Sequence, residues 1–504
     1  MTAAAATNVP QERDVLAGRR GDVLAVLTIV VMVIAVRSPA LLLSVADYDE
    51  SLYLLVARDV LAGHLPYLTV WETKPPLFFF LIAAWSKIFG LSIVSYRFLA
   101  DAAVAVTALA IYRIGAAFEA RGRLIGFTAA LTYAGLTVSD SGTASEAEIF
   151  IAPFITLAAA NILPALAART GVTARTAFCA GLFLGCATQI KESAGLEALY
   201  VGVLGAILLR RNVGALAALI FGAVVPVVLD IVPYAVTSTM PAYLDANLWS
   251  LLRRTHTPSH PPYLDVVRQQ AEALFPSIFL AAALPQALRH SASRDRRLIY
   301  LLVAWCVIDL VTVAGIREFL AYQFLPVMVP LSVISAWTAV RLLGSRASLV
   351  PAALSIAIGI IVIHDAGQLV TAQRTLVQRY VRNDRYYGDD TMRIAAYLDA
   401  HRGTGKWLYV ARDEPVLYFL TGAPVPTRFP FPPHLIQPEQ EQVAGTDGAA
   451  EIRRIFSRKP RYVVFDGPVS RPEDAAVAVI AQNLRTDYDV VFSVDARRVY
   501  CRHL

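Results

Sequence analysis

The sequence predicts a polytopic α-helical membrane protein that ends in a small α/β domain. Of its 504 residues, 56% are hydrophobic and 17% are charged, and the mean hydropathy is +0.53. Soluble proteins carry charge on about a quarter of their residues, so this composition indicates a membrane protein. Apolar stretches of near-spanning length recur as far as residue 368, and the sequence turns polar from about residue 373.

Charge and cysteine usage argue against two other classes of protein. The formal net charge is +6, but the arginines fall in short clusters between apolar stretches and form no single basic face. Nucleic acid is therefore not expected as a partner. Three of the 4 cysteines lie inside apolar stretches and Cys501 stands alone near the end, so neither a disulfide framework nor a paired-cysteine zinc site is expected.

The apolar stretches predict about eleven transmembrane helices, some of them near the short limit for a bilayer. The first follows Arg19 and Arg20 and ends in Ser-Val-Ala, which resembles a signal-peptide cleavage site. Because this stretch is long and is interrupted by Arg37 and Pro39, we expect a span that is not cleaved. The expected spans are 23–46, 96–117, 123–140, 148–167, 174–190, 193–209, 213–235, 273–288, 298–315, 319–340 and 348–368.

The apolar segment 75–90 is short enough to be either a span or a helix in the membrane interface. If the tail 1–21 is cytoplasmic and segment 75–90 does not cross, every short arginine cluster between spans falls inside, as the positive-inside rule requires. If it did cross, those clusters would all lie outside. We therefore expect a transmembrane domain over 22–370, with an outer first loop, 47–95, that contains a juxtamembrane helix.

The same parity places residues 371–504 outside as an extracytoplasmic domain, periplasmic in a cell with two membranes. Its pattern predicts alternating helices and strands without an internal repeat, which is typical of an α/β domain. The expected helices are 391–401, 449–459 and 472–484, and the expected strands are 406–411, 461–466 and 488–494, with a proline-rich loop at 423–434.

Ionisable residues gather on the outer face in this topology. Ionisable residues at the boundary of a membrane domain are candidates for function. They are Asp47, Asp49, Glu50, Lys74, Glu146, Glu148, Lys191, Arg317 and Glu318. Such a group suits displacement at the anomeric carbon of a sugar with a lipid phosphate as the leaving group. A carboxylate, Asp49 or a neighbour, would take the proton of the incoming hydroxyl, and Lys74, Lys191 and Arg317 would hold the phosphate.

Asp47 and Asp49 also form an Asp-x-Asp pattern, which in soluble glycosyltransferases holds a divalent metal against a nucleotide diphosphate. Hard oxygen ligands of this kind could bind a divalent cation. Nucleotide sugars are not expected outside the membrane, so a nucleotide-sugar role is not expected here. A divalent cation is left open as a cofactor, and no residue is assigned as a metal ligand.

The first outer loop resembles that of the GT-C glycosyltransferases. The matching segments are Asp-Tyr-Asp-Glu-Ser-Leu-Tyr at 47–53, Ala-Arg at 57–58, Gly-His-Leu-Pro-Tyr at 63–67 and Lys-Pro-Pro-Leu at 74–77. The likeness is to the branch, related to glycosyltransferase family 39, that contains protein O-mannosyltransferases, aminoarabinose transferases of lipid A and the core transferases of rhizobia.

Other segments extend the resemblance over nearly the whole chain. Ser-Glu-Ala-Glu at 145–148 is similar to the family's second acidic site, Gln-Ile-Lys at 189–191 to its Thr-Lys element, and residues 414–422 to the outer domain of many members. Arg317 followed by Tyr322 is similar to the stretch before its late span. That stretch often carries a histidine before its tyrosine, which is missing at 321–323.

The resemblance implies a role for each matched residue. Asp49 matches the catalytic carboxylate, with Glu50 beside it as orienter or acceptor ligand, and Asp47 remains an alternative base. Lys74, Lys191 and Arg317 are implied to bind the donor phosphate. The residues implied to bind substrate are Tyr53, Arg58, Glu146, Glu148 and Tyr322.

The sequence as a whole predicts a GT-C glycosyltransferase of the cell inner membrane with its active site on the outer face. It would transfer a sugar from a polyprenyl-phosphate donor to a glycan, lipid or protein acceptor, with inversion at the anomeric carbon as the resemblance implies. The alternative is a transporter or flippase of a polyprenyl-linked lipid. A transporter site is expected near the membrane midplane, often with repeat symmetry, whereas these charges gather at one surface.

Overall fold

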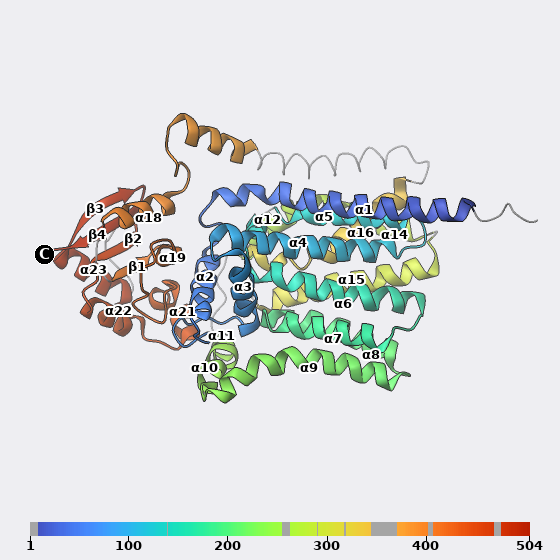
Figure 1. The fold of residues 1–504 in the computed structure, drawn as a ribbon, viewed down its shortest axis with the longest axis horizontal. Coiled ribbons are helices and arrows are strands. Elements are labelled where there is room, and N and C mark those ends of the chain that lie inside the picture. The colour runs from blue at the N-terminus through green and yellow to red at the C-terminus, as the bar shows by residue number, and fades with distance from the viewer. Residues whose placement is uncertain are drawn as a thin grey trace, which may run out of the picture.

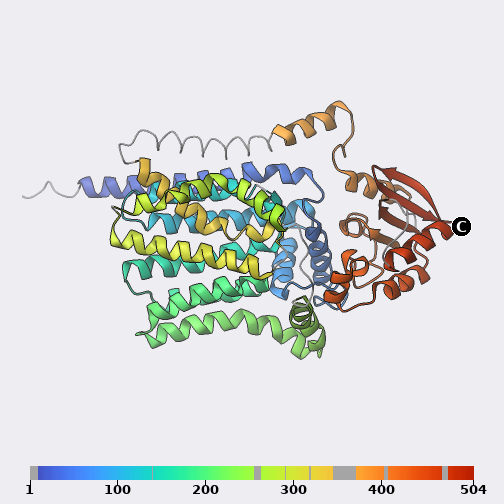
Figure 2. The same cartoon turned by 180° about the vertical axis from the view of Figure 1, so that it is seen from behind.

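The computed structural model describes residues 9–138, 140–254, 263–289, 291–316, 319–343, 370–401, 407–467 and 475–503. Long helices run side by side in a bundle, and a domain with a small sheet lies beyond one end of that bundle (Figure 1). The view from behind shows the same two parts (Figure 2). The short helices between the two parts carry residues of the candidate site.

The bundle confirms the expected polytopic helical fold. Among the described residues, 6 helices are long and apolar enough to cross a membrane, and Pro76–Phe89, Ala174–Thr188 and Met328–Leu342 are shorter apolar helices. The bundle helices are α1 (Val9–Arg37), α4 (Ile93–Ala116), α5 (Gly122–Leu136), α6 (Ala147–Ala168), α7 (Ala174–Thr188), α8 (Gly195–Leu209), α9 (Val213–Val236), α15 (Ser293–Ile316) and α16 (Met328–Leu343).

One of the expected spans differs from this pattern. The stretch 273–288 consists of two short helices, α13 (Phe275–Ala282) and α14 (Leu284–Leu288), each with a proline in its first turn. Proline lacks an N–H and clashes with the preceding turn, so it begins a helix and does not continue one. The expected span 348–368 lies outside the described residues.

Short helices lie across the end of the bundle that faces the sheet domain (Figure 1). These are α2 (Tyr48–Leu61), α3 (Pro76–Phe89), α10 (Met240–Leu244) and α11 (Ser250–Arg254). Helix α3 begins at the second of two consecutive prolines, and its Leu77 N–H donates to Asp230 of α9 at 3.1 Å. This bond satisfies one of the free N–H groups of the first turn and attaches α3 to the bundle.

The C-terminal part is an α/β domain, as the sequence predicts. Its sheet has the order β1-β2-β4-β3, with β1 and β2 parallel and the other pairs antiparallel. The strands are β1 (Leu408–Arg412), β2 (Tyr462–Asp466), β3 (Tyr488–Val494) and β4 (Arg497–Arg502), and the longer helices are α18 (Asp390–His401), α22 (Gly448–Ser457) and α23 (Ala475–Asp487). Strand β4 was not expected, because arginines occupy half of it and obscure the alternation of apolar residues.

The two parts of the chain share hydrophobic cores. Leu55 of α2 packs in the same buried cluster as Leu408 and Val464 of the sheet. Trp71, from the loop between α2 and α3, lies in a second cluster of the sheet domain, and Val416 belongs to the core of the bundle. The first outer loop is therefore packed between the bundle and the C-terminal domain and contributes to both.

Candidate active site

Helix α2 holds the central pair of the candidate site. Asp49 and Tyr53 lie one helical turn apart and therefore on the same face. The Tyr53 hydroxyl lies 3.4 Å from Oδ2 of Asp49 and 3.5 Å from Oε2 of Glu146, which directly precedes α6. The hydroxyl of Tyr53 thus connects two carboxyl groups that are 97 residues apart in the sequence.

These two carboxyl groups have different surroundings. Glu146 is 1% exposed, and its Oε1 has no hydrogen-bond partner, whereas Asp49 is partly exposed. Burial, followed by the nearby charges of Asp49 and Asp47, raises the pKa of Glu146 well above its usual range. The raised pKa favours the protonated form of Glu146, and the Tyr53 hydroxyl can donate to either carboxyl group. Two carboxyl groups in contrasting environments are the usual arrangement of an acid and a base.

Lys74 lies above this pair. Its Nζ is 5.3 Å from the centre of the Tyr53 ring and 3.1 Å from Oε1 of Glu72. Burial opposes the charged form of Lys74, but the carboxylates of Glu72 and Asp49 outweigh burial and raise its pKa. Tyr67, which adopts a left-handed backbone conformation with φ 73°, donates its hydroxyl to the Lys74 carbonyl at 2.6 Å. Lys74 is therefore a charged group on a restrained backbone.

Lys191 forms a second cationic group on the same side. Its Nζ lies 2.5 Å from Oε1 of Glu148 and 5.1 Å from the centre of the Tyr322 ring. Tyr322 is also close enough to Tyr53 to act on its ionisation. Two cations, two tyrosines and the carboxyl groups of residues 49, 146 and 148 thus meet at one end of the bundle, as the sequence predicts.

Glu50 faces away from this group and is held in place from several sides. Its Oε2 accepts from Arg97 at 2.8 Å and from the backbone N–H of Ala46 at 3.3 Å, and its Oε1 accepts from the N–H of Ser145 at 2.8 Å. Glu50 is 3% exposed. These bonds connect α2 to α4 and to the segment before α6, so they orient the helix that carries Asp49.

Two other expected site residues have different positions. Arg58 donates to the carbonyl of Tyr418 at 3.2 Å and therefore contacts the C-terminal domain, not the Asp49 group. Asp47 occupies the position just before α2, and its charge reaches Glu146. Arg317 lies outside the described residues.

The structure also places residues beside Lys74 that were not expected. Glu72 is its ion-pair partner, Arg254 at the end of α11 lies 3.6 Å from Glu192, and His434 comes from the C-terminal domain. Only Glu72 carries a usable signal, an acidic residue two positions before Lys74 in the recognised loop. Arg254 and His434 are brought there by chain folding over long sequence distances.

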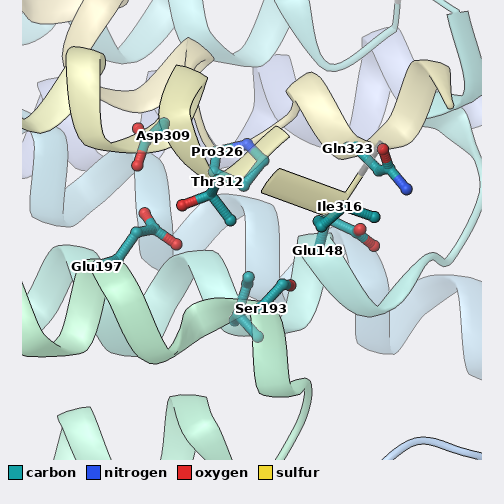
Figure 3. A pocket seen from close by; sticks show the side chains of 9 residues that line it. Glu148, Ser193, Glu197, Asp309, Thr312, Ile316, Gln323 and Pro326 are labelled. Atoms are coloured by element: carbon teal, nitrogen blue, oxygen red, sulfur yellow. The ribbon is translucent and has the colours of Figure 1, made fainter. Parts of the chain in front are cut away.

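A small pocket lies beside Lys191's partner, Glu148 (Figure 3). Glu197 of α8 and Asp309 of α15 face one another across it, and Nε1 of Trp305 donates to Glu197 at 3.0 Å. The enclosed space is about 10 Å³, which is room for about one water molecule. It is too small to hold a sugar.

The arrangement can perform acid-base chemistry beside a bound anion. Among the parts of the chain that the structure describes, no three metal-ligating side chains of the His, Cys, Asp and Glu types converge on one point. A partly exposed carboxylate, a buried carboxyl group with a raised pKa and buried cations do converge. Such a group can deprotonate a nucleophile and stabilise negative charge on a leaving group.

Solved structures resemble this chain, whereas no protein-family model and no curated protein matches it. ArnT from Cupriavidus metallidurans bound to undecaprenyl phosphate matches with a TM-score of 0.64 at 16% identity, over 95% of this chain and 97% of that chain. The chain has the GT-C fold. The apo state of ArnT gives a TM-score of 0.61 at 14% identity, over 96% of this chain and 98% of that chain. At this identity the GT-C fold is what the two proteins share, and function must be argued from the site.

Proposed function

We propose that this protein is a glycosyltransferase that moves a sugar from a polyprenyl-phosphate donor to an extracytoplasmic acceptor. The observation that carries the proposal is the contact of Asp49, Tyr53 and Glu146 beneath Lys74. Tyr53 thus contacts the proposed base, Asp49, through its hydroxyl and faces the proposed phosphate-binding cation, Lys74, with its ring. The structure of ArnT with undecaprenyl phosphate supports a lipid phosphate as the donor's carrier, because that protein has the same fold.

Asp49 acts as the base in this mechanism. It takes the proton of the acceptor hydroxyl or amine, whose oxygen or nitrogen bonds to the anomeric carbon as the bond from that carbon to the phosphate oxygen breaks. The leaving electron pair stays on the phosphate, where Lys74 and Lys191 stabilise it, together with Arg317. Attack opposite to the phosphate inverts the anomeric carbon.

Tyr53 and Glu146 keep Asp49 ready for this task. A protonated Glu146 donates to Tyr53, whose hydroxyl then has its own hydrogen free for Asp49. The carboxylate of Asp49 is thereby held toward the lysine side of α2 while it still lacks a proton. Removal of the Glu146 proton would place a second negative charge beside Asp49 and disturb both groups.

The arginine distribution supports an inner-membrane protein with this site on the periplasmic face. The loops 117–121, 169–173 and 210–212 lie at the end of the bundle opposite to the sheet domain (Figure 1). Arginines in or beside these loops are typical of cytoplasmic loops. The Asp49 group would then face the compartment where acceptors of the cell envelope occur, whether glycan, lipid or protein.

The test is sugar transfer by the purified protein. A panel of polyprenyl-phosphate sugars is offered with an envelope extract as acceptor, and transfer is measured for wild type, Asp49→Asn and Asp59→Asn. Asp59 lies on the same helix, and its Oδ2 accepts from Thr69 outside the Asp49 group. We expect wild type and Asp59→Asn to consume one donor and Asp49→Asn to be slower by about 100- to 10,000-fold.

The same experiment separates the enzyme from a transporter. If wild-type protein consumes no donor but moves polyprenyl-linked lipid across vesicle membranes, the transferase proposal is wrong. Equal transfer by wild type and a folded Asp49→Asn variant would instead refute the role of Asp49 and leave the enzyme class standing.

A further inference from the structure

A second cavity lies in the C-terminal domain, away from the Asp49 group. The chain ends at the tip of this domain that points away from the bundle (Figure 1). Arg502 and His503, close to that end, line a cavity of about 310 Å³. Ligand pockets in proteins usually measure about 300–1,000 Å³, so this one has room for a monosaccharide unit. The transfer chemistry at Asp49 does not account for it.

The walls of this cavity are fixed by the fold of the domain. Tyr488 and Arg502 lie opposite one another where β3 pairs with β4. The Tyr488 hydroxyl donates to the carbonyl of Pro460 at 2.7 Å, and the backbone N–H of His503 donates to the carbonyl of Asp487 at 2.9 Å. These bonds join both strands to the segments that follow α22 and α23. The cavity is therefore part of the folded domain and not a gap between loose side chains.

The lining combines largely buried rings with polar groups. Phe456 and Tyr488, which are 8% and 6% exposed, meet edge-on with 6.0 Å between ring centroids. Lys459, Asn483 and Asp487 add a cation, an amide and a carboxylate. Apolar rings with a few polar groups around them are the usual composition of a pocket for a small molecule.

Lys459 occupies a backbone position that suits glycine better than lysine. It follows the end of α22 with φ 54°, and its N–H donates to the carbonyl of Phe456 at 2.9 Å. Glycine is common just after a helix in this left-handed conformation, because a Cβ atom is sterically unfavourable there. The chain instead has a lysine whose side chain lines the cavity. A residue kept in an unfavourable conformation at a cavity wall indicates a use for its side chain.

The charges of the cavity are not neutralised by one another. Within the described parts of the chain, neither the ammonium group of Lys459 nor the guanidinium group of Arg502 has an ion-pair partner. Asp487 belongs to the same lining and forms no ion pair with either of them. His503 pairs with Asp489 at 3.1 Å. Two cations and one carboxylate therefore remain for a ligand.

The ends of two helices reduce this positive charge without cancelling it. The last turns of α22 and α23 end at the cavity, and a helix C-terminus carries about half a negative charge. The carbonyls of Phe456 and Asp487 at these ends already accept backbone N–H groups, from Lys459 and His503. The full charges of Lys459 and Arg502 therefore leave one side of the cavity suited to an anion.

We propose that this cavity binds an acidic sugar unit, whose carboxylate or phosphate group lies between Arg502 and Lys459. The guanidinium group of Arg502 can bind two oxygens of such a group at once. Asp487 repels a simple inorganic anion but accepts hydrogen bonds from sugar hydroxyls. Asn483 uses its amide N–H on the carbonyl of Val479 at 2.8 Å, and its side-chain oxygen can accept from a further hydroxyl.

This inference rests on the proposed function, because it takes the sugar to be part of the acceptor. The cavity lies at the tip of the C-terminal domain, so it holds a unit of an extended acceptor that is distant from the one that reacts. Binding at a second place raises the effective concentration of the acceptor at Asp49. The acceptor would accordingly be an acidic glycan.

The first test measures binding of four probes to the full-length protein in detergent by titration calorimetry. Glucuronic acid carries a carboxylate, glucose 6-phosphate carries a phosphate, glucose has no charge and inorganic phosphate has no sugar. We expect at least one acidic sugar to bind about 10-fold or more tightly than glucose and than inorganic phosphate, as for a charge-assisted contact supported by hydroxyl bonds. The acidic sugar that binds more tightly identifies the charged group.

Two variants locate the binding. Lys459→Gly removes a cation and relieves the left-handed conformation, so its unfolding temperature should equal or exceed that of wild type. Arg502→Gln removes the guanidinium group. Each should weaken binding of the preferred acidic sugar by about 3- to 10-fold, as for one partly exposed charged contact. Arg453→Gln is the matched control, because Arg453 is exposed on α22 outside the lining, and it should bind like wild type.

Sugar transfer to an envelope extract gives a second measurement. Lys459→Gly and Arg502→Gln should raise KM for the acceptor more than they lower kcat, because the cavity holds the acceptor and contacts no reacting atom. Arg453→Gln should change neither constant.

Several outcomes would overturn the inference. Equal affinity of wild type for glucose and the acidic sugars contradicts recognition by charge, and equal affinity for inorganic phosphate contradicts recognition of a sugar. Wild-type affinity in both folded variants places the binding elsewhere. If wild type transfers sugar but binds none of the probes, this inference alone is wrong. If wild type binds an acidic sugar but consumes no donor, the proposed function is wrong and the sugar site remains.

Discussion

Asp49 and Glu50 are adjacent in α2, yet their carboxylates have different partners. Successive residues of a helix point about 100° apart, so the Asp49 side chain meets Tyr53 while that of Glu50 meets Arg97. The acidic pair and its place in the loop after the first span could be predicted from the sequence. Which acid is held by an arginine could not, because Arg97 follows 47 residues later and only the fold brings it back.

Glu50→Gln should therefore lower stability more than it alters chemistry. The change leaves Arg97, 2% exposed, without its anionic partner, and loss of one member of a buried ion pair costs about 3–5 kcal/mol. Thermal unfolding in detergent measures the effect. The double variant Glu50→Gln with Arg97→Met removes the stranded charge and should recover a large part of the loss, as a double-mutant cycle would show. A single variant as stable as wild type would contradict the structural role of the pair.

For Lys74 and its neighbours, too, the sequence predicts the shared location but not the individual side-chain partners. The sequence predicts that Lys74, Lys191, Glu146 and Glu148 share one face of the membrane domain, and the structure brings them together. It does not predict that Lys191 and Glu148 pair directly or that Arg58 contacts the outer domain. Side-chain partners depend on helix rotation and packing, which the topology of spans leaves open.

Among the elements, α7 and α9 are distinguished by how closely they approach. A Cβ atom added to Gly181 would lie 1.9 Å from the carbonyl oxygen of Leu219, and one added to Gly222 would lie 2.3 Å from that of Phe178. Small residues at such crossings allow helix backbones to touch, which favours association where the surrounding lipid is as apolar as the helices.

Gly181→Ala should separate the two helices and destabilise the bundle by roughly 1–3 kcal/mol, the usual range for overpacking. Gly202→Ala in α8 is the matched control, because its new methyl group would meet only a side-chain atom of Leu184 at 3.7 Å. Unfolding temperatures of the two variants in the same detergent decide the matter. A Gly181→Ala protein no less stable than Gly202→Ala would show that the close contact is dispensable.

Element types were predicted more reliably than their interruptions. Long apolar stretches such as Val213–Val236 have one stable form in a membrane, a helix, because every backbone group must be bonded internally. The break between α13 and α14 and the presence of β4 depend on local competition between prolines or charged residues and the surrounding pattern. Whether the helix breaks or the strand forms at such a position is decided by tertiary packing.

At the scale of the molecule, α2 joins the bundle to the C-terminal domain. Its Tyr48 hydroxyl donates to the carbonyl of Asp413 at 2.8 Å, and Ser51 donates to Glu414 at 3.3 Å. Burial, together with the charge of Asp413, raises the pKa of Glu414 to about 8, although Arg497 and the Ser51 hydroxyl act in the other direction. The interface thus contains a carboxyl group that holds its proton near neutral pH.

Stability should consequently fall as pH rises across this interface. Glu414 binds its proton in the folded state up to pH about 8 but in the unfolded state only to about 4.5, so folding takes up a proton in that window. Each step upward in pH within the window therefore favours unfolding. Unfolding temperatures measured between pH 5 and 8 should decline for wild type and be flatter for Glu414→Gln. The exposed Asp399→Asn should keep the wild-type slope, and an unchanged slope in Glu414→Gln would refute the assignment.

The position of α2 also bears on when the protein becomes active during its synthesis. Tyr48 and its partner Asp413 are 365 residues apart, so the helix that carries Asp49 acquires its packing against the C-terminal domain only after that domain has been made. Until then Leu55 lacks its core and α2 has only one of its two supporting surfaces. A chain that ends before the C-terminal domain would therefore carry Asp49 on a helix that lacks one of its two supporting surfaces.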